Sequence, residues 1–446
     1  MTYFKKSGLA LLLIPFFFAC DDPSELGLEV DSENTNVKVA FIDIILPVST
    51  IYIDSLRTED QNNILFGSFE DSISGKVSAT GYTMYNQDLN STNDLPNIAD
   101  VFHSLSLVLS VSDFKSDDIA VNQSISIHLA KDTLFKEGIY LSNRFTDYDP
   151  EPIGELTFDF NPAIDTVLTI PLDSLFGEFL FDRLKRTNLD SASLDSLLLS
   201  LYHFDPLVIV PGENNNSLFS LDLREDTTGI YVNFDNESGI LSTYRFDMLV
   251  GRSTEAHYTH LSRDIGNSKL STLMEDYDAI DNISRSYLNP LSGVYPKIDL
   301  EPLTTFVSQN TDIIINRSDL TLPYSNIDLG YIEPVDFIYF FFIQDNDKIN
   351  ATGTLTGNAI DKSLLTEGSY LSSSEQTFIT FTKDEDNLSY TGSTTFFTQI
   401  FVDNVLNGTD FLTQEMVVMA PRTMGLGQTS FINNEIKLRI YYTSLK

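Results

Sequence analysis

The sequence predicts an all-β protein, mainly antiparallel, with two β-sandwich or jelly-roll-like units and a few short helices. Apolar and polar residues alternate with a period of two in many short segments, and turn-forming residues separate these segments. Only one segment has a clear helical period. Many short strands joined by such turns are typical of sandwiches, and 446 residues suffice for two of them.

The first twenty residues have the three-part layout of a secretory signal. Two lysines form a basic start, an apolar run covers residues 9–18, and Ala19 precedes Cys20, the only cysteine of the chain. The run is shorter than the roughly 20 residues that a membrane span needs. We therefore expect residues 1–19 to be a signal peptide and Cys20 to carry a lipid anchor, as in bacterial lipoproteins. The alternative is a secreted protein with a cysteine there by chance.

Residues 20–38 are rich in acidic side chains and lack apolar periodicity, which predicts a lipidated acidic tether between anchor and fold. The whole chain carries a formal net charge of −37. A field of that sign repels nucleic acid and anionic lipid head groups. We expect no nucleic-acid partner. The membrane is expected as a partner only through the lipid.

The first sandwich domain is predicted at residues 39–250. Alternation is clearest in Ser104–Val111 and Ser124–Ala130, where apolar side chains share one face. A helical insert near residues 172–199 interrupts the strands. Its apolar residues recur at helical spacing: Leu172, Leu175, Phe176, Phe179, Leu180 and Leu184.

The second sandwich domain is predicted at residues 251–446. Val335–Ile343 is apolar without alternation, as in a central strand that is covered on both faces. Ile436–Tyr442 alternates and predicts a strand near the C-terminus. Residues 270–283 and 301–309 are weaker helix candidates.

Glu255, His257 and His260 form a Glu-x-His-x-x-His pattern, which on a helix can offer zinc two nitrogens. The neighbourhood instead favours strand or loop, and in a strand this spacing points the two histidines to opposite faces. Catalytic zinc needs a third ligand, which the sequence does not identify. We expect no metal at these residues and no cofactor in the protein.

Acidic clusters offer a second kind of candidate site. None matches a calcium-binding loop, so ordinary charged turns are expected, with weakly bound calcium as the alternative. Paired carboxylates for glycoside hydrolysis are a spatial feature that a sequence does not reveal. The clusters lie at residues 147–151, 275–278, 345–347 and 384–386.

A triplet of Asp, then Ser or Thr, then an aliphatic, Thr or Met residue is more frequent than the roughly two or three copies that composition predicts. It resembles the acceptor site for O-glycosylation of exported proteins in Bacteroidota. Each single copy also suits a helix cap or a turn. The triplets begin at Asp54, Asp71, Asp132, Asp165, Asp173, Asp190, Asp195 and Asp226.

Several segments of apolar strand residues and turn glycines resemble the Bacteroidota lipoproteins of domain-of-unknown-function family 4270. The resemblance covers nearly the whole chain after Cys20 and implies an outer-membrane lipoprotein of unknown role, without catalytic residues. The chain departs from the family pattern at Asp71-Ser72, where Asp-Pro is expected. The segments are Leu65–Asp71 with Gly75–Lys76, Pro152–Gly154, Gly229–Tyr231, Gly293–Ile298, Ile315–Leu320 and Lys437–Thr443.

These features favour a non-enzymatic, lipid-anchored binding or scaffold protein of the outer membrane, whose partner is an envelope protein or a glycan. The alternative is a glycan-binding surface lipoprotein or a glycan-active hydrolase. Asp21 and Asp22 follow the cysteine and resemble an export signal to the outer leaflet. We therefore favour the cell surface over the periplasmic face.

Overall fold

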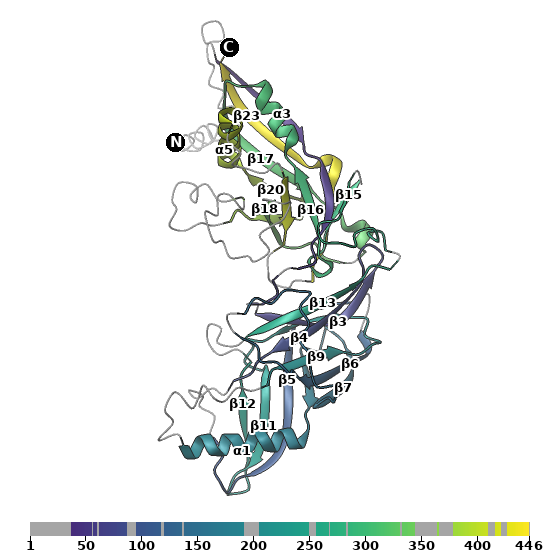
Figure 1. The fold of residues 1–446 in the computed structure, drawn as a ribbon, viewed down its shortest axis with the longest axis vertical. Coiled ribbons are helices and arrows are strands. Elements are labelled where there is room, and N and C mark those ends of the chain that lie inside the picture. The colour runs from purple at the N-terminus through teal and green to yellow at the C-terminus, as the bar shows by residue number, and fades with distance from the viewer. Residues whose placement is uncertain are drawn as a thin grey trace, which may run out of the picture.

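The computed structural model describes residues 37–55, 57–59, 62–86, 95–116, 120–135, 138–190, 205–248, 256–266, 268–281, 284–330, 332–343, 364, 378–408, 415–420 and 426–445. Strands dominate these ranges, and the strand ladders are antiparallel. The predicted all-β fold is therefore confirmed. Figure 1 shows an elongated molecule with two lobes.

One lobe, here the terminal lobe, contains the first and last described strands. A small pair, β15 (Arg285–Leu288) and β22 (Thr429–Ile432), lies beside its main sheet. The main sheet has ten strands in the order β1 (Val37–Ile45), β23 (Lys437–Leu445), β17 (Ile313–Pro323), β20 (Ser389–Ser393), β19 (Phe381–Asp384), β18 (Phe337–Phe342), β21 (Glu415–Met419), β16 (Val294–Asp299), β2 (Val48–Tyr52) and β14 (Ala279–Ile280).

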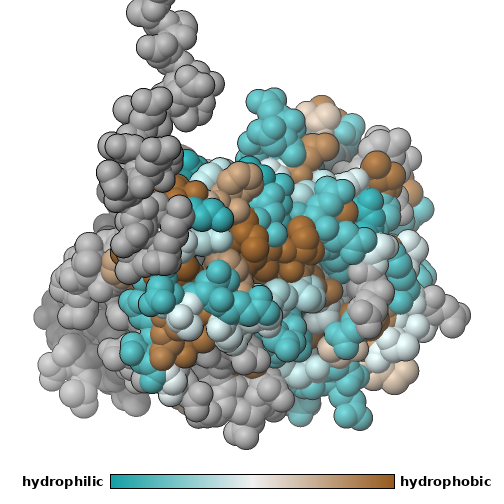
Figure 2. Space-filling model, turned by 90° about the horizontal axis from the view of Figure 1, so that it is seen from above, coloured by the Kyte–Doolittle hydropathy of each residue, from teal (hydrophilic) through white to brown (hydrophobic). Residues whose placement is uncertain are grey.

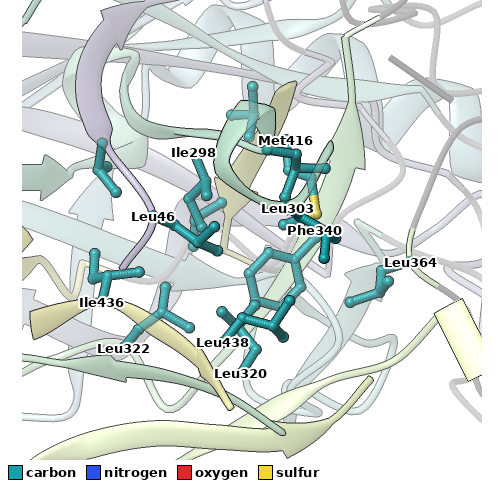
Figure 3. Packing of buried hydrophobic residues seen from close by; sticks show 14 of the residues in the cluster. Leu46, Ile298, Leu303, Leu320, Leu322, Phe340, Leu364, Met416, Ile436 and Leu438 are labelled. Atoms are coloured by element: carbon teal, nitrogen blue, oxygen red, sulfur yellow. The ribbon is translucent and has the colours of Figure 1, made fainter. Parts of the chain in front are cut away.

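The ten-stranded sheet folds back on itself around one core. Only Leu46 and Pro47 separate β1 from β2 in the chain, yet seven strands lie between them in the sheet. The two ends of the sheet must therefore meet, and two layers face each other. Figure 3 shows Leu438 of β23 beside Phe340 of β18, both within the core cluster. Each such buried side chain contributes about 1.5–3 kcal/mol through the hydrophobic effect.

The other lobe, here the central lobe, has an eleven-stranded sheet with a core of its own. In this sheet β13 (His257–Asp264) pairs with β4 and β8 (Val167–Pro171) pairs with β5, beside the main path. The main path runs β12 (Leu241–Phe246), β11 (Gly229–Asp235), β5 (Val101–Lys115), β10 (Leu218–Asp222), β3 (Asn63–Asp71), β4 (Gly75–Thr83), β9 (Leu207–Pro211), β6 (Ala120–Leu129) and β7 (Gly154–Phe160).

Sheet membership differs from the predicted division between residues 250 and 251. β1 and β2 lie early in the chain but belong to the terminal lobe, and β13 lies after the predicted boundary but pairs with β4 in the central lobe. The pairing of Val37 with Leu445 joins the two ends of the described chain. Alternation identifies a strand but not its partner, so periodicity could not reveal these long-range pairs.

Three α-helices lie among the described residues: α1 (Ser174–Asp190), α3 (Glu301–Gln309) and α5 (Thr395–Asn407). α1 lies within the predicted insert near 172–199, and α3 coincides with the candidate at 301–309. The candidate at 270–283 is wrong, because its described part forms turns and the short strand β14. Within the described ranges, no helix has both the length and the apolar character that a membrane span requires.

Candidate functional site

Two of the predicted site residues, Cys20 and Glu255, lie outside the described residues. His257 and His260 both lie on β13, and the extended backbone turns their side chains to opposite faces. Among the described residues, no group of three or more His, Cys, Asp or Glu side chains is placed to hold a metal ion. β13 therefore does not bring the two histidines together as a pair of ligands.

His260 lies under the segment that follows β6. Its ring meets the ring of Phe145 edge-on, with 5.6 Å between centroids. Burial lowers the pKa of His260 below its ordinary value of 6.5. His260 is therefore a neutral side chain in the folded protein at neutral pH, while His257 on the other face is buried.

The described acidic clusters form turns. The side chain of Asp278 accepts hydrogen bonds from the backbone N–H groups of Met274 and Glu275, at 2.9 and 2.7 Å. Asp384 accepts from the N–H groups of Asp386 and Asn387 in the β19–β20 hairpin, both at 3.0 Å. Such bonds to the backbone are the usual way in which acidic side chains hold turns.

Of the other two acidic clusters, only the one at residues 147–151 lies within the described residues. In the cluster at 147–151, Oδ1 of Asp149 accepts from the N–H of Glu151 at 3.2 Å, and the carbonyl oxygen of Asp149 lies 2.8 Å from Nδ1 of His128. This segment therefore also forms a hydrogen-bonded turn. The cluster at 345–347 lies outside the described residues.

The described Asp-Ser/Thr triplets lie in loops and turns, at the start of α1 and at its end. Asp173 caps α1, because its Oδ1 accepts from the N–H groups of Leu175 and Phe176. Asp71 holds the β3–β4 turn through the N–H groups of Ile73 and Ser74. Asp190 is the last residue of α1, and Asp195 lies outside the described residues. Among the acceptor residues that the structure describes, four are exposed: Ser72, Thr166, Ser174 and Thr227.

The junction between the lobes gathers polar contacts that the sequence did not suggest. The guanidinium of Arg263 on β13 lies 4.3 Å from the ring centroid of Tyr52 on β2, and burial lowers the pKa of Arg263. Nδ2 of Asn289 donates to Oγ of Ser74 at 2.8 Å. These contacts fasten β13 and the β3–β4 turn of the central lobe to the terminal lobe.

A second group at the junction centres on Tyr287. Its hydroxyl donates to Oδ2 of Asp328 at 2.7 Å and contacts Nζ of Lys269. Nη1 of Arg285 lies 3.8 Å from Oδ1 of Asp328. Burial and the Asp328 carboxylate raise the pKa of Tyr287 well above its ordinary value. Tyr287 therefore keeps its proton and acts as a hydrogen-bond donor, which suits a structural junction better than proton transfer.

Apolar side chains are exposed at the far end of the central lobe, where α1 lies (Figure 1). α1 packs against β5, since a Cβ added at Gly177 would come within 2.3 Å of the Phe102 ring. Near its C-terminus, Asn188 donates to the Pro96 carbonyl at 3.1 Å. Two apolar residues on the outer side of α1, here the α1 surface, are each at least 57% exposed: Leu175 and Phe179. Other exposed apolar residues lie in the loops and strand ends of the same end of the lobe: Ile98, Val101, Ile240 and Leu241.

The α1 surface corrects one expectation from the sequence. Leu175 and Phe179 share the helical apolar pattern with Leu180 and Leu184, but only the latter two are buried. Periodicity shows which residues share a face of a helix, whereas the neighbouring strands decide how much of that face is covered. The sequence shows that the apolar stripe is wide, but it does not show which part of the stripe stays exposed.

The chain matches no protein-family model, no curated protein and no solved structure.

Proposed function

We propose that the chain is a lipid-anchored protein of the outer membrane that acts as a non-enzymatic binding or scaffold component of the cell envelope. One observation carries this proposal. The chain leads from the predicted anchor, Cys20, into β1 of the terminal lobe, whereas the α1 surface lies at the opposite end of the molecule (Figure 1). A long body held at one end presents the other end to a partner.

The exposure of the α1 surface supports an envelope protein as the partner. Neighbouring exposed apolar side chains, such as Leu175 and Phe179 one turn apart on α1, commonly mark protein–protein contacts on a soluble body. The absence of tryptophan removes one of the usual stacking platforms for sugars, which makes a glycan the second choice. The resemblance to family 4270 agrees with an outer-membrane lipoprotein, and we favour the cell surface as the side that the body faces.

The anchor and the partner need separate tests. Changing Cys20 to Ser should move the protein from the membrane fraction to the soluble fraction, because the lipid is then lost. Persistence in the membrane fraction after this change would reject the anchor.

The partner is tested with a photo-cross-linking residue at Phe179 in the anchored protein in cells. We expect a defined adduct with an envelope protein. The same residue at Phe135, which is 68% exposed on a loop, serves as the matched control and should give no such adduct. Equal adducts at both positions, or none at Phe179, would reject the α1 surface as the binding site.

A further inference from the structure

The outer face of β1, β23 and β17 carries a mixed apolar and basic surface at the end of the terminal lobe. The other face of these strands packs on the core and on α3, where the Phe306 and Tyr442 rings meet at 5.3 Å. The outward residues, here the β1 face, align in rows across the three strands. From the tip inward the rows are Val39–Thr443–Ile314, Phe41–Tyr441–Arg317, Asp43–Arg439–Asp319 and Ile45–Lys437–Thr321.

Apolar side chains of the β1 face are strongly exposed. Val39 and Phe41 are each 64% exposed, and Ile314 is 63% exposed. The rings of Phe41 and Tyr441 lie side by side, with 5.8 Å between centroids. Figure 2 looks down on this end of the molecule and shows hydrophobic residues at the surface among hydrophilic ones.

The charges of the β1 face differ from those of the whole chain. Arg439 binds Asp43 with two hydrogen bonds, of 2.6 and 2.7 Å, and Nε of Arg317 lies 2.7 Å from Asp319. Both acidic side chains of the face are thus paired with arginine, and Lys437 adds a further positive charge. A chain with a net charge of −37 therefore has one face that does not repel a lipid surface.

β1 is also the last strand at one end of the ten-stranded sheet. A nine-residue edge strand with exposed apolar side chains invites contact with another surface. Natural edges are usually protected by charge, by bulges or by a cover. Lys38 and Asp43 place charges on β1, but Val39 and Phe41 between them form an exposed apolar stretch that favours a permanent neighbour.

The chain itself indicates which neighbour that is. Sixteen residues separate Cys20 from Val37, the first residue of β1. Fully extended, they span roughly 55 Å at about 3.3–3.6 Å per residue. A bilayer that holds the lipid of Cys20 is therefore always within reach of the β1 face. Because the lipid already holds the chain to the bilayer, docking of the β1 face on it is intramolecular, and weak contacts are enough to keep the face docked. A second copy of the chain or a soluble partner would first have to bind from solution.

We propose that the β1 face lies on the surface of the bilayer that carries the anchor, with neutral or zwitterionic head groups against Val39, Phe41 and Tyr441. Aromatic side chains prefer the head-group level, and the long arginine and lysine side chains keep their charges in water beside it. This inference rests on the proposed lipid anchorage. It adds an orientation, because docking of this face fixes the terminal lobe against the membrane.

The absence of tryptophan from the chain gives a direct test. Phe41→Trp introduces a single fluorescent reporter on the β1 face, and Phe179→Trp, at a position that is 57% exposed, is the matched control on the α1 surface. Each lipidated protein is reconstituted in phosphatidylcholine vesicles that contain a lipid with a quencher near the head group. We expect at least twofold stronger quenching for Phe41→Trp than for Phe179→Trp.

The possible outcomes are distinct. If the protein floats with the vesicles but Phe41→Trp is not quenched, the anchorage stands and the docking is rejected. If the protein does not float, the anchorage fails and the docking fails with it. A blue shift of Phe41→Trp that depends on protein concentration, without quenching by the lipid, would show self-association and also overturn the proposal.

A second variant separates docking from a change in fold. Val39→Asp in the Phe41→Trp background should reduce quenching to the level of Phe179→Trp and leave flotation and Tm unchanged. Val121→Asp on β6, at a position that is 53% exposed, should leave the quenching as it was. Equal quenching with and without Val39→Asp would contradict the docking.

Discussion

The guanidinium of Arg263 stacks on the ring of Tyr52, 4.3 Å from its centroid, and this contact joins the two lobes. Arg263 belongs to β13, which extends the sheet of the central lobe, and Tyr52 ends β2 of the terminal lobe. Each lobe has its own hydrophobic core. The polar contacts lie beside apolar ones, since Phe69 of β3 belongs to one buried cluster with Leu291. The stability of the whole molecule therefore depends partly on this mixed junction between the two lobes.

We expect a coupling free energy of about 0.5–2 kcal/mol between Arg263 and Tyr52, because a cation over an aromatic ring gains more where water is partly excluded. A double-mutant cycle with Arg263→Met and Tyr52→Leu measures it by urea unfolding. The control is the exposed pair Arg439 and Phe41, in which the guanidinium lies 5.9 Å from the ring centroid. The coupling free energy of this pair should be smaller. Equal coupling in the two pairs would contradict a special role for the junction.

The strands that alternation predicted are those in which one face meets a core. Ile436–Tyr442 was predicted as a strand, and β23 buries Leu438 and Ile440 there. Val335–Ile343, which lacks alternation, was predicted as a central strand covered on both faces. β18 is central, between β19 and β21, but its second face is only partly covered, since Phe337 is 38% exposed and Tyr339 and Phe341 are half-buried. Local patterns suffice for strands such as β23, because burial on one face leaves a periodic trace in the sequence.

The candidate site depended on distant contacts and could be predicted only in part. The opposite orientation of His257 and His260 followed from the expected strand. The junction could not be predicted, because Arg263 and Tyr52 lie on strands that are far apart in the sequence and come together only when the two lobes pack. The mixed β1 face likewise arises from pairing between the two ends of the described chain.

Gly67 is a position at which a methyl group should not be tolerated. Its φ is +115°, and an added Cβ would lie 2.1 Å from the Ser217 carbonyl oxygen. Gly239 also has a positive φ, +71°, but its Cβ would meet no atom within 4 Å. We expect Gly239→Ala to cost roughly 1–2 kcal/mol from backbone strain alone. Gly67→Ala should cost at least about 2 kcal/mol more in urea unfolding. Equal costs would show that β3 and β10 approach less closely in solution.

Stability should fall on mild acidification in part through His260. Burial lowers the pKa of this imidazole below 6.5, so the unfolded chain takes up its proton at a higher pH than the folded chain does. The contribution of neutral His260 to the free energy of unfolding is present above pH 6.5. It is lost as the pH falls through the lower pKa of the folded state. His260→Gln should therefore reduce the slope of unfolding free energy against pH below 6.5. His103→Gln, at an exposed position, is the control, and an unchanged slope for His260→Gln would reject this account.

The exposure of the α1 surface can be tested on the helix itself, without knowing the partner. Leu180 and Leu184 are 0% exposed, so changing either to Ala should cost about 2–5 kcal/mol in unfolding free energy. Leu175 is 74% exposed, and Leu175→Ala should change it by less than about 0.5 kcal/mol. The four substitutions Leu175→Ala, Phe179→Ala, Leu180→Ala and Leu184→Ala thus divide the helical stripe into a packed and a free half. A cost at Leu175 as large as at Leu180 would mean that the stripe is covered in the isolated protein. A partner would then have to displace that cover before binding α1.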